Sequence, residues 1–452
     1  MKFSLNCSNS FLFVTSVERL KMDTYPDELL SALNSKLQPH SRNRSSSMEK
    51  GEINRLCRQV SIESPNLLKG DCVYNAIVPV GNCPPKGARI LVVYAGACYR
   101  RARETSNSSI GSLNQEQLCR EMSDISFTAA ALAQMQSAGS YGRENSLSQT
   151  SPQNCGYRDA ALFPGFEVAG VIESLGSELK STCGFTVGQR VCLYPYDGVP
   201  AGYSEIFVVP DLRYLIPIPD NLELSVAAML PTGALLAMSS ILSAHKIIDN
   251  LHKKSKDANK PVKLLIVGTG GLALWTLRIA AQHFYTKDSK DKVEITVASL
   301  RDEGLEMAKH EFENINFVQW SEDLYEKQLI ERTLDSCNGL VDIVIDFGTT
   351  SRSLHRSLQC LNDGGVVLIS EETAEKLLPK FSRKAEERKQ HIEPVPLGTI
   401  EQLHEVVRLV ANNEITPPPH TVFPAEQAAE VIRKLVHSEI PGRAILKFHD
   451  IE

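Results

Sequence analysis

The pattern of apolar and polar positions distinguishes two regions in the part of the chain that we expect to be ordered. Short apolar or alternating runs, separated by Gly and Pro, cover residues 88–99, 162–176, 185–195 and 201–210. Such runs predict short strands, because alternate side chains of a strand face the core and turn residues end each strand. The pattern therefore predicts a mostly β, partly barrel-like domain in this part of the chain.

From Ser225 onwards the pattern changes to strands that alternate with helices. Apolar strand runs and helical spacings follow one another in five segments, at 262–284, 293–300, 340–348, 351–361 and 364–370. This alternation predicts a doubly wound parallel sheet of the α/β class. Two amphipathic helices are then expected at 401–415 and 424–440, and a last strand at 442–448.

Two polar segments lack either period. Residues 1–70 include the Ser- and Arg-rich run 41–50, and we expect a disordered N-terminal tail, with a phosphorylation-regulated tail as the alternative. Residues 104–155 are rich in Ser, Asn, Gln and Gly, and only their middle, 123–135, has helical character. An insert this long is usually functional or disordered, and we favour a flexible insert.

Composition narrows the class of partner. The 452 residues carry a net charge of −6, so charge gives no indication of nucleic-acid or membrane-surface binding. No apolar stretch approaches the ~18 residues that a membrane span needs. The N-terminus is a poor signal peptide, and the eleven cysteines show no repeated spacing. Reduced thiols and a cytoplasmic location are therefore expected.

The glycine-rich turn carries the most specific chemistry. Residues 268–273 read G-x-G-x-x-A directly between an apolar strand and an apolar helix. Gly268 permits a tight turn, Gly270 lets the backbone approach a pyrophosphate, and the free N–H groups of the helix end attract the phosphates. We therefore expect a dinucleotide here, held by Gly268, Thr269, Gly270, Gly271 and Leu272. The alternative is a glycine turn that binds nothing.

The end of the second parallel strand bears on which dinucleotide binds. NAD sites usually place Asp or Glu there, whereas NADP sites replace it and add a cation. This sequence has Ser299 at that position and Arg301 two residues on, a hydroxyl and a guanidinium for a 2′-phosphate. NADPH is therefore favoured, and NADH stays possible if Asp302 supplies the acidic group and Arg301 only lies on the surface.

Three sequence blocks together resemble the medium-chain dehydrogenase/reductase superfamily. They are PGFEVAGVIESLG with VGQRV, the fingerprint LLIVGTGGLALWTLRIA, and the C-terminal ITPPPHTVFPAEQAAEVIRKLVHSEIPGRAILKF. The resemblance implies a GroES-like substrate domain plus a Rossmann domain. The GroES-like domain would cover 71–230 with the insert inside it, and the Rossmann domain 231–378. Residues 379–452 would return to the first domain. A homodimer joined edge to edge through the cofactor sheets is common in the family.

The resemblance also indicates which positions of this chain would hold a catalytic zinc ion. Zinc alcohol dehydrogenases of the family hold catalytic zinc with a Cys, a His and a second Cys or an acidic residue. Cys98 matches the first position, but Phe166 stands in the second and Thr232 in the third. Because catalytic zinc needs three protein ligands, we expect no metal. The structural-zinc cysteines are missing too. The sequence is closer to the zinc-free branch, which resembles quinone oxidoreductases and NADPH-dependent alkenal reductases.

The candidate catalytic residues are Cys98, Tyr99 and Arg100. Arg100 falls at the relay position of the alcohol dehydrogenases and forms a basic cluster with Arg101 and Arg103. The cluster would stabilise a developing enolate, or it is a solvated loop. Tyr99 would donate a proton, and packing is the alternative. Cys98 is either a reactive thiol or a small buried side chain.

Further residues take their expected roles from the resemblance. Gly348 and Thr349 match the loop beside the nicotinamide ribose, and Arg443 matches an arginine that contacts the cofactor phosphate. A structural hydrogen bond is expected of Glu167, and packing rather than proton donation of Tyr194 and Tyr196. Three histidines show no constellation and are expected to be ordinary surface or packing residues, namely His245, His391 and His404.

Two classes of function remain open. The first is a zinc-independent NADPH oxidoreductase that transfers hydride to a small molecule, a quinone or an α,β-unsaturated carbonyl. The second is a catalytically silent relative that serves as an NADPH sensor or scaffold. A zinc-dependent alcohol dehydrogenase with rearranged ligands is a weaker alternative.

Overall fold

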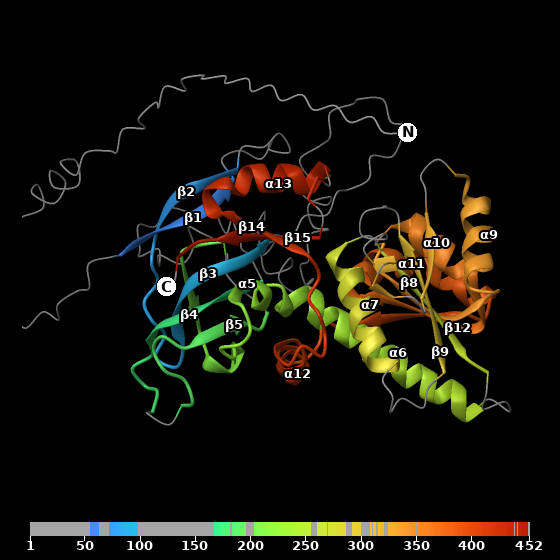
Figure 1. The fold of residues 1–452 in the computed structure, drawn as a ribbon, viewed down its shortest axis with the longest axis horizontal. Coiled ribbons are helices and arrows are strands. Elements are labelled where there is room, and N and C mark those ends of the chain that lie inside the picture. Colours follow the sequence, from blue (N-terminus) through green and yellow to red (C-terminus); the bar gives the residue numbers. More distant parts are fainter. Residues whose placement is uncertain are drawn as a thin grey trace, which may run out of the picture. The chain divides into compact units, whose positions relative to one another are not determined.

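Two large sheets, a two-stranded sheet and the surrounding helices make up the described part of the chain in this computed structural model (Figure 1). The structure describes residues 55–62, 72–97, 167–180, 183–195, 203–254, 260–268, 270–285, 292–299, 308–309, 311–312, 315–320, 324–348, 350–437, 439–440 and 442–450. All of them belong to one compact unit.

The antiparallel sheet forms from the short runs that the pattern predicts. Its order is β14-β15-β3-β4-β5-β7, and β6 pairs with β3. The strands are β3 (Ala88–Ala97), β4 (Val168–Leu175), β5 (Arg190–Leu193), β6 (Ile206–Val209), β7 (Leu215–Pro217), β14 (His420–Pro424) and β15 (Arg443–Lys447). β14 and β15 pair in parallel, and β15 then pairs antiparallel with β3. The C-terminal segment of the chain therefore completes the sheet that β3 begins.

The parallel sheet has the order β10-β9-β8-β11-β12-β13. Its strands are β8 (Val262–Val267), β9 (Val293–Ser299), β10 (Asn316–Gln319), β11 (Val341–Asp346), β12 (Leu361–Ser370) and β13 (His391–Val395). β8 and β11 are almost continuously buried, as strands covered on both faces must be. Together the two sheets confirm the predicted α/β fold class.

Helices cover the parallel sheet and connect it to the antiparallel one. They are α6 (Leu235–Lys254), α7 (Gly271–Phe284), α9 (Glu326–Ser336), α10 (Ser351–Cys360), α11 (Glu371–Glu387) and α12 (Ile400–Ala411). The shorter elements are η2 (Leu212–Tyr214), α5 (Leu224–Ala227), η3 (Leu230–Ala234), η4 (Ala425–Gln427) and α13 (Ala428–His437). α6 follows η3 directly and packs against α7 and α12. The connecting helix therefore lies against the helix that follows the glycine turn.

Two segments differ from the sequence expectation. β1 (Leu56–Ile62) lies inside the range 1–70, where we expected a disordered tail, and it pairs with β2 (Cys72–Pro79). Cys57 and Val60 of β1 are buried, but Arg58 within the strand and Arg55 just before it interrupt the apolar pattern in the sequence. The expected Rossmann boundary at residue 378 falls within α11, and β13 beyond it still belongs to the parallel sheet. The insert 104–155 lies outside the described residues.

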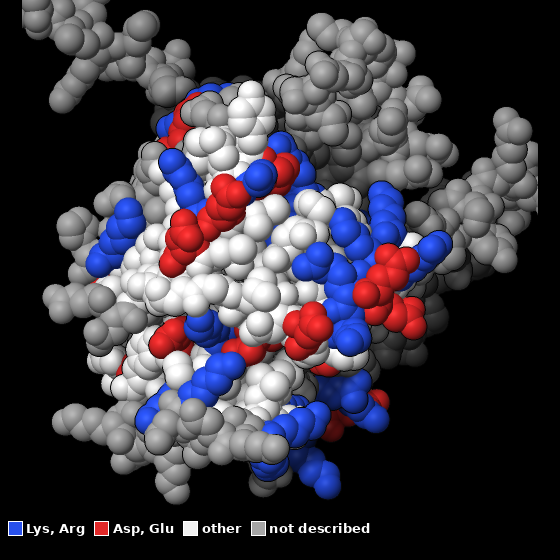
Figure 2. Space-filling view, turned by 90° about the vertical axis from the view of Figure 1, so that its right-hand side faces the viewer, with Lys and Arg blue, Asp and Glu red and all other residues white. Residues whose placement is uncertain are grey.

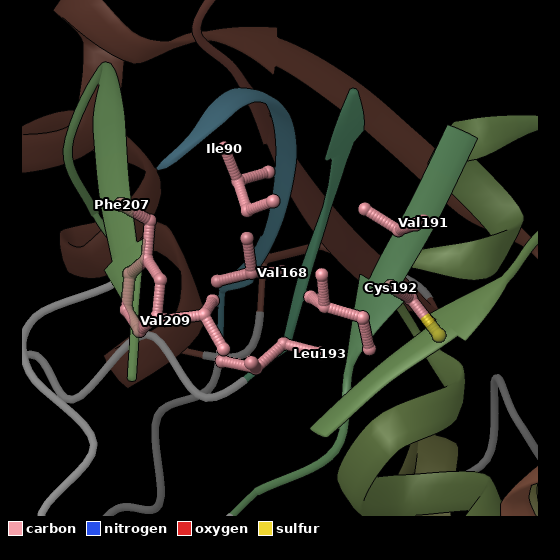
Figure 3. Close-up of a pocket in the computed structure, with 8 residues that line it drawn as sticks. Ile90, Val168, Val191, Cys192, Leu193, Phe207 and Val209 are labelled. Atoms are coloured by element: carbon pink, nitrogen blue, oxygen red, sulfur yellow. The ribbon is translucent and has the colours of Figure 1, made fainter. Parts of the chain in front are cut away.

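One cluster of buried apolar side chains contains residues of both large sheets. Ala169 and Ile216 of the antiparallel sheet share one buried cluster with Ile266 and Ile345 of the parallel sheet. The interior of the antiparallel sheet is packed separately, by apolar side chains from β3, β4, β5, β6 and β7 (Figure 3). The space that these side chains enclose has no room for a water molecule. This interior is a core and no place for a substrate.

Charges of both signs are interspersed on the face of the molecule that Figure 2 shows. That face has no large patch of one sign. Among the residues that the structure describes, none of the helices combines the length and apolar character that crossing a bilayer requires.

An ion pair between α9 and α10 gives the fold a pH dependence. Arg356 donates from Nε and Nη2 to the Glu326 carboxylate at 2.5 and 2.7 Å, Arg352 pairs with the same group, and Arg356 lies over the Trp320 ring. The hydrogen bonds from Arg356 lower the pKa of Glu326 to about 2, against the opposing effect of burial. Because the folded-state pKa is below the unfolded one, this stabilisation is complete above about pH 5 and is lost as the pH falls towards 2.

We therefore expect Glu326→Gln to lower the free energy of unfolding by about 1 kcal/mol at pH 7, a value reduced for solvent screening. Urea unfolding of wild type and variant at pH 7, 5 and 4 measures this difference. The difference should stay constant from pH 7 to 5 and become smaller at pH 4. A difference that grows as the pH falls would contradict the assignment.

Candidate functional site

The glycine turn lies where β8 passes into α7. Gly270 is the N-cap of α7, is exposed, and has extended backbone angles with φ −133° and ψ −168°. The first bond of the helix runs from the Leu274 N–H to the Gly270 carbonyl at 3.2 Å. The N–H groups of residues 271–273 therefore have no partner within the helix and are available to an anion at the positive end of its dipole.

The glycines of this turn have different surroundings. A Cβ on Gly268 would lie 3.2 Å from the Cβ of Ala273 and 3.3 Å from that of Phe347, so the turn packs closely on α7 and on the end of β11. A Cβ on Gly270 would meet nothing within 4 Å. The turn is therefore tight on the protein side and open on the side where a pyrophosphate would approach.

Glu167 is the centre of a polar cluster at the edge of the antiparallel sheet. Its side chain is 3% exposed and forms an ion pair with Arg443. One carboxylate oxygen also accepts from the Thr232 hydroxyl and, at 3.3 Å, from the Gly233 N–H. The Glu167 carbonyl accepts from the Gly96 N–H at 2.8 Å. The structural hydrogen bond that we expected of Glu167 is confirmed.

Arg443 connects this cluster to the glycine turn. Its side chain is 11% exposed, and a Cβ on Gly271 would lie 2.3 Å from its Cδ. Trp275, one turn further along α7, is fully buried, and its Cδ1 lies 3.5 Å from the position of a Cβ on Gly233. The guanidinium is therefore held between Glu167 and the first turn of α7. Its contact with a cofactor phosphate stays a prediction.

A second polar cluster orders the loop after β11. The Asp346 carboxylate is buried and accepts from the Ser353 hydroxyl at 2.7 Å, the Ser357 hydroxyl at 2.8 Å and the Gly348 N–H at 2.7 Å. A Cβ on Gly348 would lie 2.0 Å from the Ser353 Oγ, so this position needs glycine. These hydrogen bonds through Asp346 therefore fix the loop after β11, which we expect beside the nicotinamide ribose, to α10.

Tyr194 follows β5 at the same edge of the antiparallel sheet as Glu167. Ala169 pairs with Cys192 in these antiparallel strands, and the same register places residue 194 opposite residue 167. The Tyr194 hydroxyl donates to the Gly398 carbonyl at 2.7 Å, between β13 and α12. Its ring packs on the shared core, so the expected packing role is confirmed. The bond also connects the antiparallel sheet to the chain after β13.

The structure places only part of the predicted site. Gly268, Gly270, Gly271 and Leu272 lie together at the start of α7, and the buried Ser299 ends β9 beside them in the sheet. Outside the described residues lie Cys98, Tyr99, Arg100, Phe166, Tyr196, Thr269, Arg301 and Thr349. β3 ends at Ala97, which pairs with Ala444 next to Arg443. The catalytic role of residues 98–100 stays a prediction.

Two features escaped the sequence analysis. Asp346 was not singled out, although an acidic residue at the carboxyl end of an apolar strand is a signal that merits attention. The second is a contact of His245, expected to be an ordinary surface or packing residue, whose Nδ1 lies 3.1 Å from Nε2 of His283. The two histidines are 38 residues apart on different helices, so no local pattern indicates their contact.

The residues that the structure describes contain no group of three or more His, Cys, Asp or Glu side chains able to hold a metal ion. Thr232, at the expected third zinc position, donates its hydroxyl proton to Glu167. The hydroxyl is therefore already used by a buried carboxylate.

Comparison with known proteins supports this architecture. A family model described as a zinc-binding dehydrogenase matches residues 323–446. The quinone oxidoreductase from Coxiella burnetii aligns at 16% identity over 87% of this chain and 99% of its own, with a TM-score of 0.56. Acetophenone reductase from Geotrichum candidum, in complex with NAD, aligns at 16% identity over 89% and 100%, with a TM-score of 0.55.

A cinnamyl alcohol dehydrogenase from Sorghum bicolor aligns at 13% identity over 87% of this chain and 98% of its own, with a TM-score of 0.56. No curated protein matches the sequence. At these identities the structural likeness establishes the fold. That fold is the one of the medium-chain dehydrogenases and reductases, which combines a Rossmann-like parallel sheet with an antiparallel sheet.

Proposed function

We propose that this protein is a zinc-independent NADPH oxidoreductase that reduces a quinone or an α,β-unsaturated carbonyl. The observation that carries the proposal is the glycine turn, which is closely packed at Gly268 and open at Gly270. When bound there, NADPH would supply the hydride. The protein would hold the phosphates with the N–H groups at the start of α7 and orient the two reactants.

The cofactor assignment is supported by Ser299 at the end of β9. A neutral hydroxyl stands where an NAD site would carry a carboxylate, and Arg301 follows it in the sequence. Acetophenone reductase, one of the structural neighbours, is in complex with NAD, and another, CAD from Helicobacter pylori, is complexed with NADP(H). Proteins with this fold therefore include complexes with NAD and complexes with NADP(H).

Zinc independence is supported by two positions in this chain. Phe166 cannot coordinate zinc, and the Thr232 hydroxyl donates to Glu167. One of the neighbours with this fold is a quinone oxidoreductase, and reduction of a quinone is one of the two activities proposed here. The matched family is described as zinc-binding, so metal analysis of the purified protein, with zinc absent in stoichiometric amounts, is the direct check.

Gly270→Asp tests the proposal at its central residue. The extended backbone of Gly270 accepts any residue and its Cβ position is open, so the variant should fold normally. Its carboxylate would repel the pyrophosphate and occupy its place. We expect the affinity for NADPH, measured by fluorescence titration, to fall at least about tenfold, or 1.4 kcal/mol, with an unchanged Tm.

NADH titrated in parallel and a substitution on the far side of the fold, Asp363→Asn, serve as controls. Wild-type protein that binds neither nucleotide would overturn the proposal. Binding of NADPH without turnover of quinones or enones would instead favour the catalytically silent sensor, which needs the same nucleotide site.

A further inference from the structure

A pair of histidines joins α6, the helix that leads into the parallel sheet, to α7, the helix between β8 and β9. His245 lies on α6 and His283 in the last turn of α7. Nδ1 of His245 is 3.1 Å from Nε2 of His283, and the rings meet edge to face with centroids 4.8 Å apart. The side chain of His245 is 34% exposed, so ions in solution can reach the pair.

The spacing of the two nitrogens suits a metal ion. Zinc binds imidazole nitrogen at about 2.0–2.1 Å, so two nitrogens 3.1 Å apart would subtend roughly 100° at the metal. That angle lies between the octahedral and the tetrahedral value. Neutral imidazole is a preferred ligand of Zn²⁺, Ni²⁺ and Cu²⁺. The pair therefore offers two nitrogens at a separation that one metal ion can bridge, and water would supply the other ligands.

The surroundings of the pair favour a cation. Nε2 of His245 lies 3.7 Å from the Asp249 carboxylate, one turn further along α6. At that distance the carboxylate is no hydrogen-bond partner, but its negative charge beside the pair favours a bound cation. His283 is in the last turn of α7, where the negative end of the helix dipole attracts positive charge.

We propose that His245 and His283 form a site for a divalent transition-metal ion, with the Asp249 carboxylate beside it. The site is separate from the candidate cofactor site. Thirteen residues of continuous helix separate Thr232 from His245, which corresponds to about 20 Å. Since the ion would bind groups on both helices, it would hold α6 against α7 and stabilise the folded state.

Calorimetric titration with NiCl₂ tests the site, with MgCl₂ as the negative control because Mg²⁺ prefers oxygen ligands. We expect one equivalent of Ni²⁺ to bind wild type and to raise its Tm. His283→Asn and His245→Asn should each abolish that equivalent. Asp249→Asn should weaken binding less than either histidine variant, because it removes only a nearby negative charge. His404→Asn removes an exposed histidine from α12 and should change nothing.

A second measurement uses wild-type protein alone, so it holds even if a variant fails to fold. Ni²⁺ should slow the carbethoxylation of His245 and His283, read by mass spectrometry, and leave His404 unaffected. Equal Ni²⁺ binding by wild type and both histidine variants would overturn the site, because the metal would then be held elsewhere, for example by cysteine thiols. Failure of wild type to bind Ni²⁺ at millimolar concentration would also overturn it.

Discussion

Replacing Glu167 with Gln is expected to lower the free energy of unfolding by about 3–5 kcal/mol, the cost of breaking a buried ion pair. Both members of the pair are nearly inaccessible, with side chains 3% and 11% exposed for Glu167 and Arg443. Glutamine removes the negative charge and leaves the guanidinium buried beside Gly271 without its anion. Thr232 and the Gly233 N–H would also lose a charged acceptor.

Urea unfolding at pH 7 measures this cost, with the surface variant Glu331→Gln as the matched control. Glu331 pairs with Lys327 on α9, where both side chains are exposed, and its loss should leave stability unchanged within error. The double variant Glu167→Gln/Arg443→Met should lose less than the sum of the single losses, because it leaves no buried charge. A loss below about 1 kcal/mol in Glu167→Gln would show that water reaches the pair.

The elements that the sequence predicts best are those whose burial is nearly complete. β8, β9 and β11 read as continuous apolar runs because both faces of the parallel sheet are covered. β13, with the sequence HIEPV, is the edge strand of the same sheet, and most of its side chains are exposed. An edge strand with a Pro and polar side chains has no apolar pattern to recognise, so the domain boundary was placed too early.

The candidate site shows the same limit in a different form. The glycine turn is local, since six consecutive residues contain both the turn and the helix start, and the sequence places it correctly. In the Glu167 cluster the partners are distant in sequence. Thr232 is 65 positions from Glu167 and Arg443 is 276 positions from it. The family resemblance indicates which residue types to expect at these positions. Only the packed fold places Arg443 in contact with both Gly271 and Glu167.

The second large effect is expected at Asp346, where one carboxylate satisfies three donors. Asp346→Asn keeps the shape of the side chain but presents an N–H₂ group to at least one of Ser353, Ser357 and the Gly348 N–H. Hydrogen bonds to a charged group contribute about 1.5–3 kcal/mol, and a buried donor without an acceptor carries a further cost. We therefore expect the free energy of unfolding to fall by about 3 kcal/mol, measured by urea unfolding.

The same substitution should also act on the nucleotide site, because the acceptor that fixes the Gly348 loop would change from a charged carboxylate to a weaker neutral amide oxygen. We expect weaker NADPH binding in Asp346→Asn at a temperature where the variant is still folded. Ser357→Ala removes one donor on the α10 side and leaves the Gly348 bond intact, so it should cost about 1 kcal/mol and preserve NADPH affinity. If both variants lose affinity equally, the effect comes from general loosening of α10, and the carboxylate has no specific part in ordering the loop.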